Sequence, residues 1–351
     1  MAEIDFPRQL TAEAIVGYYA STHNDEHRPH LGASLIGSRC ARSLWFTFRW
    51  CGRKSVDGRL ARLFETGHLE EPRMAQNLRA IGVELHTETP EGKQWSVSAV
   101  GGHFGGSMDG CGKGFPEGPK TWAVWECKTS GTKAFKQMQA DGVMKAKPQH
   151  FAQMQVYMGL TGMKRAMYTM VCKETDEIYS EWVHFNEAIF AELMERAERV
   201  VKSAEPPIGI SQDPSYYECK FCDHRDVCHG AVPEVNCRTC AHSTPEMDGE
   251  ARWSCQRHDC DIPLDGQRVG CTDHVYIPIL LVKHGQQVDA ERRPDGGIDV
   301  VYTTDDGSWV QGAAGLTSEE MRVVQPGAAV AAYQVKVELQ RQGFGEAKVV
   351  A

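Results

Sequence analysis

The sequence has no long hydrophobic run and no overall excess of positive charge. Its richest apolar segment, residues 275–282, is far shorter than the roughly 20 residues that a membrane-spanning helix needs, so we expect no membrane span. The first residues, MAEIDFPRQL, lack a basic start followed by an apolar stretch. We therefore expect no secretory signal and a location in a reducing cytoplasm. The net charge of −9 argues against a basic surface throughout, although a local groove of Lys and Arg can still hold a phosphate backbone.

Cysteine, in contrast, is abundant. The 351 residues include 13 cysteines, and in a reducing compartment cysteines serve as metal ligands more often than as disulfides. Charged residues at 24% and hydrophobic residues at 41% describe a globular protein. The length leaves room for a full-sized core plus one or two accessory modules.

Helical and strand-like patterns alternate along the first two thirds of the chain. Helices are predicted at residues 59–79 and 147–161 and after the capping residue Asn186, where apolar positions recur at helical spacing. Strand-like runs cover residues 95–100, 103–109, 121–129, 164–173 and 178–185. This order predicts an α/β core with a mixed sheet flanked by helices. Pro72, inside the first helix, is a point where that helix can kink or restart.

Changes in composition divide the chain into three predicted regions. Residues 1–230 form the predicted α/β core, residues 231–280 a cysteine-rich module, and residues 281–351 a small C-terminal appendage. The appendage contains alternating segments such as 298–303 and 333–339, so it is expected to be β-rich or helical. Its function is not indicated.

Two carboxylates and a lysine are the candidate catalytic group. Glu126 and Lys128 lie two apart in a strand-like run, so their side chains share one face. Asp109 ends another strand-like run, and the Gly/Pro-rich residues 110–120 are expected to fold it back as a hairpin partner. Cys127 points to the opposite face and offers at most its carbonyl.

Such a group suits Mg²⁺ or Mn²⁺, because hard cations take oxygen ligands and keep some waters. The cation would activate a water and stabilise charge on a phosphate, while Lys128 orients that water or contacts the phosphate. A Glu/Lys pair on a strand is also an ordinary solvated face, so the triple alone is a weak motif.

Neighbouring motifs strengthen the nuclease interpretation. The helix–strand–strand order with the D…ExK residues resembles the PD-(D/E)xK nuclease superfamily, whose restriction-endonuclease-like core is a mixed sheet flanked by helices. Gly67 followed by Glu71 resembles the first motif of the RecB-like branch, which implies that Glu71, with His68 as a second candidate, helps to bind the metal. Gln153 and Tyr157 resemble the Q-x3-Y motif of that branch, whose residues contact nucleic acid or order the site.

Four further cysteines fit the same resemblance. Cys40 precedes the core and Cys219-x2-Cys222-x5-Cys228 follows it. This arrangement resembles the iron–sulfur staple of RecB-like nucleases, including the CRISPR adaptation nuclease, and implies a [4Fe–4S] cluster that clamps the two ends of the core. Arg42, beside Cys40, is a candidate DNA contact. The resemblance covers about residues 30–230.

A second cysteine set follows. Cys237-x2-Cys240-x14-Cys255-x15-Cys271 looks like a zinc ribbon, because structural Zn²⁺ is commonly held by four thiolates. His258, Cys260 and His274 are alternative ligands for the later positions. The module resembles small zinc modules that follow nuclease domains in some bacteriophage proteins, and both a structural and a DNA-contacting role stay open. Cys51, Cys111 and Cys172 have no partner pattern.

The sequence therefore predicts a metal-dependent DNA nuclease, an exonuclease acting on DNA ends or single strands in replication, recombination or repair. A recombination or replication protein is a possible partner, and a bacteriophage or bacterial source fits the resemblance. The alternatives are a structure-specific endonuclease, a CRISPR-adaptation-type processing nuclease, and a catalytically inactive DNA-binding scaffold.

Overall fold

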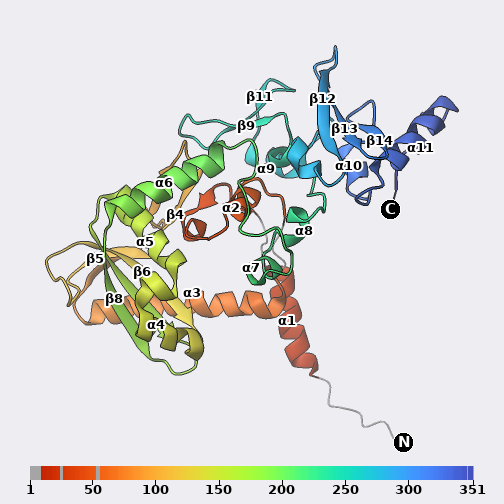
Figure 1. The fold of residues 1–351 in the computed structure, drawn as a ribbon. Coiled ribbons are helices and arrows are strands. Elements are labelled where there is room, and N and C mark those ends of the chain that lie inside the picture. Colours follow the sequence, from red (N-terminus) through yellow and green to blue (C-terminus); the bar gives the residue numbers. More distant parts are fainter. Residues whose placement is uncertain (1–8, 24–26, 53–55, 346, 351) are drawn as a thin grey trace, which may run out of the picture. The chain divides into compact units, whose positions relative to one another are not determined.

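The chain forms two compact units in the computed structural model, which describes residues 9–23, 27–52, 56–345 and 347–350 (Figure 1). The first unit takes residues 1–27, 54–97 and 106–191, and the second takes residues 28–53, 98–105 and 192–351. Residues 1–8, on which the expectation of no secretory signal rests, lie outside the described ranges. No helix in the described ranges is long and apolar enough to cross a membrane. The boundaries at 230 and 280 stay predictions.

A five-stranded mixed sheet is the centre of the first unit. Its order is β2-β5-β6-β7-β8. The strands are β2 (Glu84–His86), β5 (Gly110–Lys113), β6 (Ala123–Ser130), β7 (Arg165–Cys172) and β8 (Ile178–His184). Only β6 and β7 pair in parallel within this sheet as described. Parallel neighbours need a long crossover, and α4 (Thr132–Ala146) and α5 (Pro148–Thr161) supply it. The predicted mixed α/β sheet is confirmed.

Helix α3 (Gly58–Ala80) covers one face of this sheet, and α5 covers the other (Figure 1). Asp57 caps α3 by accepting a hydrogen bond from the Leu60 N–H at 2.6 Å. The helix continues through Pro72 as one element, so it does not restart there. The helix α1 (Leu10–Thr22) packs on α3 within the same unit.

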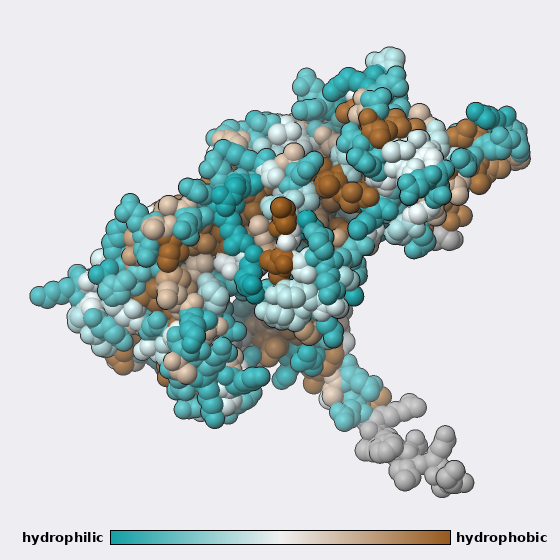
Figure 2. Space-filling view, viewed as in Figure 1, coloured by the Kyte–Doolittle hydropathy of each residue, from teal (hydrophilic) through white to brown (hydrophobic). Residues whose placement is uncertain are grey.

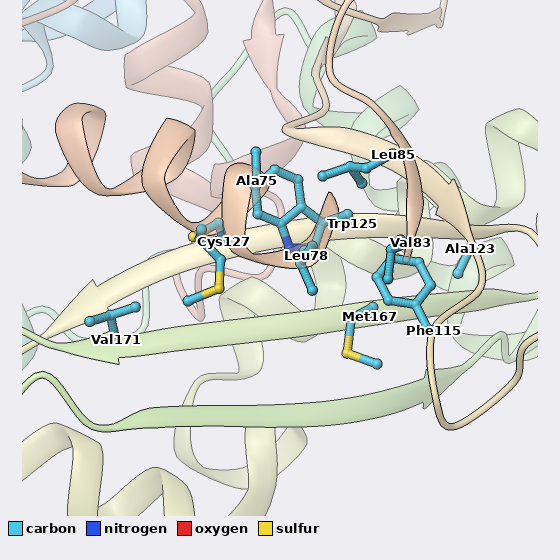
Figure 3. Close-up of a cluster of buried hydrophobic side chains, with 11 residues drawn as sticks. Ala75, Leu78, Val83, Leu85, Phe115, Ala123, Trp125, Cys127, Met167 and Val171 are labelled. Atoms are coloured by element: carbon cyan, nitrogen blue, oxygen red, sulfur yellow. The ribbon is translucent and has the colours of Figure 1, made fainter. Parts of the chain in front are cut away.

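Apolar residues of α3 and the sheet form the buried cluster in Figure 3. Trp125 and Cys127 of β6 belong to it, together with Ala75 and Leu78 of α3. Because side chains alternate along a strand, Glu126 and Lys128 lie on the opposite face. Burial of Trp125 and Cys127 thus fixes which way the two charged residues point.

The position of Asp109 corrects one prediction. The strand β4 (Phe104–Ser107) ends before Asp109, which leads directly into β5, so residues 110–113 form a strand and not a turn. A Cβ on Gly110 would lie 2.8 Å from the His86 carbonyl oxygen, so glycine allows β5 to approach β2 closely. Because glycine has low strand propensity, the sequence of β5 does not predict a strand.

The second unit contains short elements around two cysteine-rich regions. Its helical elements are η1 (Ala33–Leu35), α2 (Ala41–Phe48), α7 (Tyr217–Lys220), α8 (Arg225–Cys228), η2 (Cys237–Thr239), α9 (Leu264–Val269), η3 (Pro278–Leu281), α10 (Ser318–Met321) and α11 (Ala329–Arg341). One small sheet is formed by β9 (Ser243–Pro245), β10 (Trp253–Cys255) and β11 (Cys260–Asp261), and another by β12 (Gln286–Arg292), β13 (Ile298–Thr304) and β14 (Gly307–Gln311). The two-residue strand β1 (Leu31–Gly32) pairs in parallel with the start of β4, and the strand β3 (Ser96–Ala99) precedes β4 in the chain. Helix α6 (Glu187–Lys202), capped by Asn186 as predicted, leads the chain from the first unit into the second.

The C-terminal appendage combines both predicted forms. Residues 298–303 lie in β13, whereas residues 333–339 lie in α11. Val335 and Leu339 leave apolar surface exposed on α11 (Figure 2).

A buried arginine holds the cysteine-rich region of the second unit to α2. Arg238 stacks 3.8 Å from the centre of the Trp50 ring and donates hydrogen bonds to the carbonyls of Phe48 and Pro29. Cation–π contact offsets part of the cost of burying its charge. Aromatic rings, backbone carbonyls and the Gln267 side-chain oxygen, which accepts from Arg238 Nε at 3.0 Å, therefore surround this charge.

Candidate active site

Strand β6 places Glu126 and Lys128 side by side. The Lys128 ammonium contacts the Glu126 carboxylate and lies 3.7 Å from Asp109 Oδ2. Glu126 is fully buried, whereas Asp109 and Lys128 are partly exposed. Two acids and a base thus share one site at which solvent can enter.

Asp109 is fixed from the neighbouring strand. Its Oδ2 accepts a hydrogen bond of 2.7 Å from the backbone N–H of Cys127, between the two charged residues of β6. The Cys127 carbonyl accepts a hydrogen bond from Lys128 Nζ at 3.2 Å, while the Cys127 side chain is buried in the apolar cluster. Cys127 therefore offers the site only its backbone.

Helix α3 brings a third carboxylate. Glu71 lies one helical turn after Gly67, where an added Cβ would contact Thr129 of β6 at 3.7 Å. Burial and the charge of Asp109 raise the pKa of Glu71 to about 7, against the opposing effect of Lys128. Glu71 thus interacts electrostatically with both Asp109 and Lys128.

Burial also raises the pKa of Glu126 to about 8, although the nearby Lys128 charge lowers it. Burial alone would lower the pKa of Lys128, but Glu126 and Asp109 raise it above its usual value. Lys128 is therefore an ammonium at neutral pH. A further positive charge nearby would favour the ionised form of both glutamates.

The donor set fits a divalent cation. Three carboxylates and one ammonium leave two uncompensated negative charges when all are ionised, and Glu126 Oε2 is buried without a hydrogen-bond partner in the described structure. Buried carboxylate oxygens are rarely left unpaired, and an oxygen-binding cation would satisfy this one. No group of three or more His, Cys, Asp or Glu side chains in the described ranges already has a metal-binding arrangement. Lys128 holds the contacts with two of the acids instead.

Gln153 and Tyr157 are buried on α5, next to the acids. Gln153 Nε2 donates to the Tyr157 hydroxyl at 3.1 Å, and that hydroxyl donates to the Ser107 carbonyl at 2.7 Å. Ser107 lies two residues before Asp109. The two side chains therefore hold α5 to the connection that carries a catalytic candidate.

Two predicted residues lie apart from this group. His68 is exposed on α3, and the described residues offer it no hydrogen bond to the acids. Arg42 belongs to the second unit, where its Nε donates to the Pro207 carbonyl at 2.9 Å and its Nη1 lies 3.7 Å from Cys228 Sγ. The DNA contact predicted for Arg42 and the metal ligation predicted for His68 stay predictions.

Sequence reasoning missed His150 and Tyr168. His150 Nδ1 lies 2.8 Å from the Tyr168 hydroxyl, and Tyr168 is the β7 register partner of Glu126. His150 precedes Gln153 by three residues, so it extends the Gln153–Tyr157 face of α5 by one turn. That spacing was a signal for His150 alone, and the sequence gives none for its pairing with Tyr168.

The first cysteine set shares one pocket in the second unit. Cys40, Cys219, Cys222 and Cys228 line it together with Arg42 and His224. Burial and the neighbouring Cys228, Cys40 and Cys222 raise the pKa of Cys219. Four thiols brought together without disulfides have the complement that an iron–sulfur cluster uses.

The second cysteine set lines another pocket of that unit. Burial, followed by the proximity of Cys271, Cys255 and Cys260, raises the pKa of Cys237 to about 11. Cys240 lines the same pocket, and its pKa is raised to about 12, mainly by burial. The raised pKa values mean that these thiolates form at neutral pH only when a cation balances their negative charge. This is consistent with a metal site.

The alternative ligands differ in availability. Both ring nitrogens of His274 are engaged, Nδ1 with Ser318 and Nε2 with Thr239 and the Asn236 carbonyl. His274 is therefore committed to structural hydrogen bonds. His258 Nε2 lies 3.7 Å from Cys271 Sγ, and Cys260 lines the same pocket.

Comparison with known proteins gives distant structural likenesses. No protein-family model and no curated protein matches the chain. The chain is similar to the alkaline exonuclease LHK-Exo from Laribacter hongkongensis, with 18% identity, 52% of this chain and 89% of that chain covered, and a TM-score of 0.38. The complex of LHK-Exo with dAMP gives 17% identity, the same coverage and a TM-score of 0.37. SSO0001 gives 15% identity, 62% and 96% coverage, and a TM-score of 0.36. Scores this low do not establish a shared fold, so the site is interpreted from its own residues.

Proposed function

We propose that this chain is a metal-dependent nuclease of the PD-(D/E)xK type that hydrolyses DNA phosphodiester bonds. The observation that carries the proposal is the convergence of Asp109, Glu126 and Lys128, with the unpaired Glu126 Oε2 buried among them. Phosphodiester hydrolysis needs compensation of phosphate charge and a positioned water. Lys128 and a divalent cation held by the acids would supply both.

Each residue has a proposed role. Asp109, Glu126 and Glu71, with the Cys127 carbonyl, would hold Mg²⁺ or Mn²⁺, and His68 is a second candidate ligand. The bound ion would lower the pKa of a water and compensate charge on the phosphate. Lys128 keeps its proton and orients the water or contacts a phosphate oxygen. Gln153 and Tyr157 order the site, and Arg42 is a proposed DNA contact elsewhere on the chain.

The two cysteine pockets support separate structural proposals. Cys40, Cys219, Cys222 and Cys228 would hold a [4Fe–4S] cluster, which takes four cysteine thiolates. Cys237, Cys240, Cys255 and Cys271 would hold Zn²⁺. The shared pockets and raised thiol pKa values support both sites.

We further propose an exonuclease that acts on DNA ends or single strands. Cleavage of end-labelled DNA of both strand polarities, with Mg²⁺ or Mn²⁺, tests this. Wild type should shorten the DNA from its ends, Asp109→Ala should lose cleavage, and the exposed-site control Glu117→Ala should cleave like wild type.

Other outcomes assign the alternatives. Cuts in circular or end-blocked DNA indicate an endonuclease, and trimming to a uniform length indicates a processing nuclease. DNA binding without cleavage on any substrate indicates an inactive scaffold. Equal cleavage by wild type and Asp109→Ala would remove the active-site assignment.

A further inference from the structure

His150 occupies a place that the nuclease triad does not explain. It lies in the first turn of α5, and its ring is half-buried beside Tyr168 of β7, with ring centres 5.9 Å apart. Tyr168 is fully buried and pairs in register with Glu126. The His150–Tyr168 pair therefore borders the face that carries Glu126 and Lys128.

The hydrogen bond between them fixes the proton positions. The Tyr168 hydroxyl has His150 Nδ1 as its hydrogen-bond partner at 2.8 Å, and the described residues offer it no second acceptor. Burial raises the pKa of Tyr168, so its hydroxyl stays protonated. An unshared buried donor is costly. Tyr168 must therefore donate to Nδ1, and the neutral imidazole then carries its hydrogen on Nε2.

The charges around His150 favour an anion. Burial, together with the charges of the neighbouring Lys128 and Lys147 ammonium groups, lowers the pKa of His150 to about 3. The imidazole is thus uncharged over the whole neutral range while two cations lie close to it. A neutral N–H donor among ammonium groups is an arrangement suited to a phosphate oxygen.

We propose that His150 is a substrate-contacting residue whose Nε2–H donates to a non-bridging oxygen of the phosphodiester held beside Lys128. Tyr168 is its positioning residue, because it fixes the tautomer that leaves Nε2–H free to donate. Nε2 carries a hydrogen, so His150 cannot be the base that takes a proton from the attacking water. This inference rests on the proposed nuclease function.

The test compares His150→Ala, His150→Gln and Tyr168→Phe with wild type in single-turnover cleavage of end-labelled DNA with Mg²⁺. A hydrogen bond to a charged group corresponds to a change of about 10- to 100-fold. His150→Ala should lower kcat/KM by this amount. His150→Gln, whose amide N–H can replace Nε2–H, should recover most of it, and Tyr168→Phe should cause a smaller loss. The acidic limb of the pH profile should not move in any variant.

A binding arm separates this inference from the function. Affinity for a fluorescein-labelled single-stranded DNA with Ca²⁺ in place of Mg²⁺ should fall in His150→Ala and stay unchanged in the exposed control His184→Ala. If wild type binds but never cleaves, and His150→Ala weakens binding, the phosphate contact stands and the hydrolase assignment fails. If wild type cleaves and binds DNA, and His150→Ala changes both activities by less than about 2-fold, the His150 assignment alone is overturned. The same assignment is overturned if His150→Ala and His150→Gln lose equal amounts of kcat/KM while their thermal unfolding stays unchanged.

Discussion

At the residue scale, the site is defined by charge that the protein alone does not balance. Glu126 is buried with one oxygen unpaired in the described structure, and burial raises the pKa of Glu71 to about 7 and that of Glu126 to about 8. The grouping of Glu126 with Lys128 could be predicted from the sequence, because residues two apart share a strand face. His150 with Tyr168 could not, since no spacing rule connects a helix residue to a strand that follows it.

These raised pKa values predict that a rise in pH lowers the stability of the metal-free protein but increases the stabilisation by Mg²⁺. Their folded values of about 7 and 8 exceed the ordinary 4.5, so the metal-free folded state binds more protons than the unfolded state. Their stabilising contribution is present below about pH 4.5 and is lost as the pH rises through about 8. Mg²⁺ needs the deprotonated acids, so it should stabilise the protein more at about pH 8 than at about pH 6.

The measurement is the Mg²⁺-induced shift in thermal unfolding at each pH, recorded in magnesium-free buffer and again after Mg²⁺ is added. The buffer contains no chelator, because a chelator would strip other metals. Glu126→Gln removes one of the two titrating groups and should flatten the pH dependence. An equal Mg²⁺-induced shift at both pH values would contradict the linkage.

At the scale of elements, segments with strong hydrophobic periodicity were predicted from the sequence, whereas glycine-containing segments were not. Residues 147–161 were predicted as a helix and form α5 over Pro148–Thr161, and the predicted strands 164–173 and 178–185 form β7 and β8. Helix α4 was not predicted, and in the structure Gly142, at φ 71°, breaks its helical geometry near the end. The strand β5 was missed because its glycines serve the close approach to β2, which is a tertiary constraint.

The link between α5 and the β4–β5 connection gives an element-scale prediction. Tyr157→Phe removes the hydroxyl that donates to the Ser107 carbonyl. We expect a loss of about 1–2 kcal/mol in the free energy of unfolding, and slower cleavage because Asp109 follows the released segment. Denaturant unfolding and single-turnover cleavage measure the two effects. Unchanged stability with weaker DNA binding would instead make Tyr157 a DNA contact.

At the scale of the whole molecule, residues distant in sequence meet within one unit. The second unit contains Cys40 and also Cys219, Cys222 and Cys228, although most of the first unit intervenes in the chain. A cluster on these thiolates would close a very long loop and restrict the unfolded chain. The resemblance indicated this set from its order alone, whereas the small sheets of the same unit had no comparable signal.

Metal content tests both pockets separately. After anaerobic purification, elemental analysis of wild type should show iron and zinc. Cys219→Ser should lose iron and visible absorbance, and Cys237→Ser should lose zinc but keep iron. Cys111→Ser, a buried thiol outside both pockets, should keep both metals. Zinc in both pockets of a colourless protein would show that the first set is misinterpreted.

The path of the chain has a further consequence. The polypeptide passes between the two units after residues 27, 53, 97, 105 and 191, so no single cut releases the sheet that carries Asp109 and Glu126. A fragment starting at residue 106 would leave Glu71 behind. The acid-bearing sheet must therefore be inherited together with residues 98–105 of the second unit, because these residues lie between β2 and β5 in the chain.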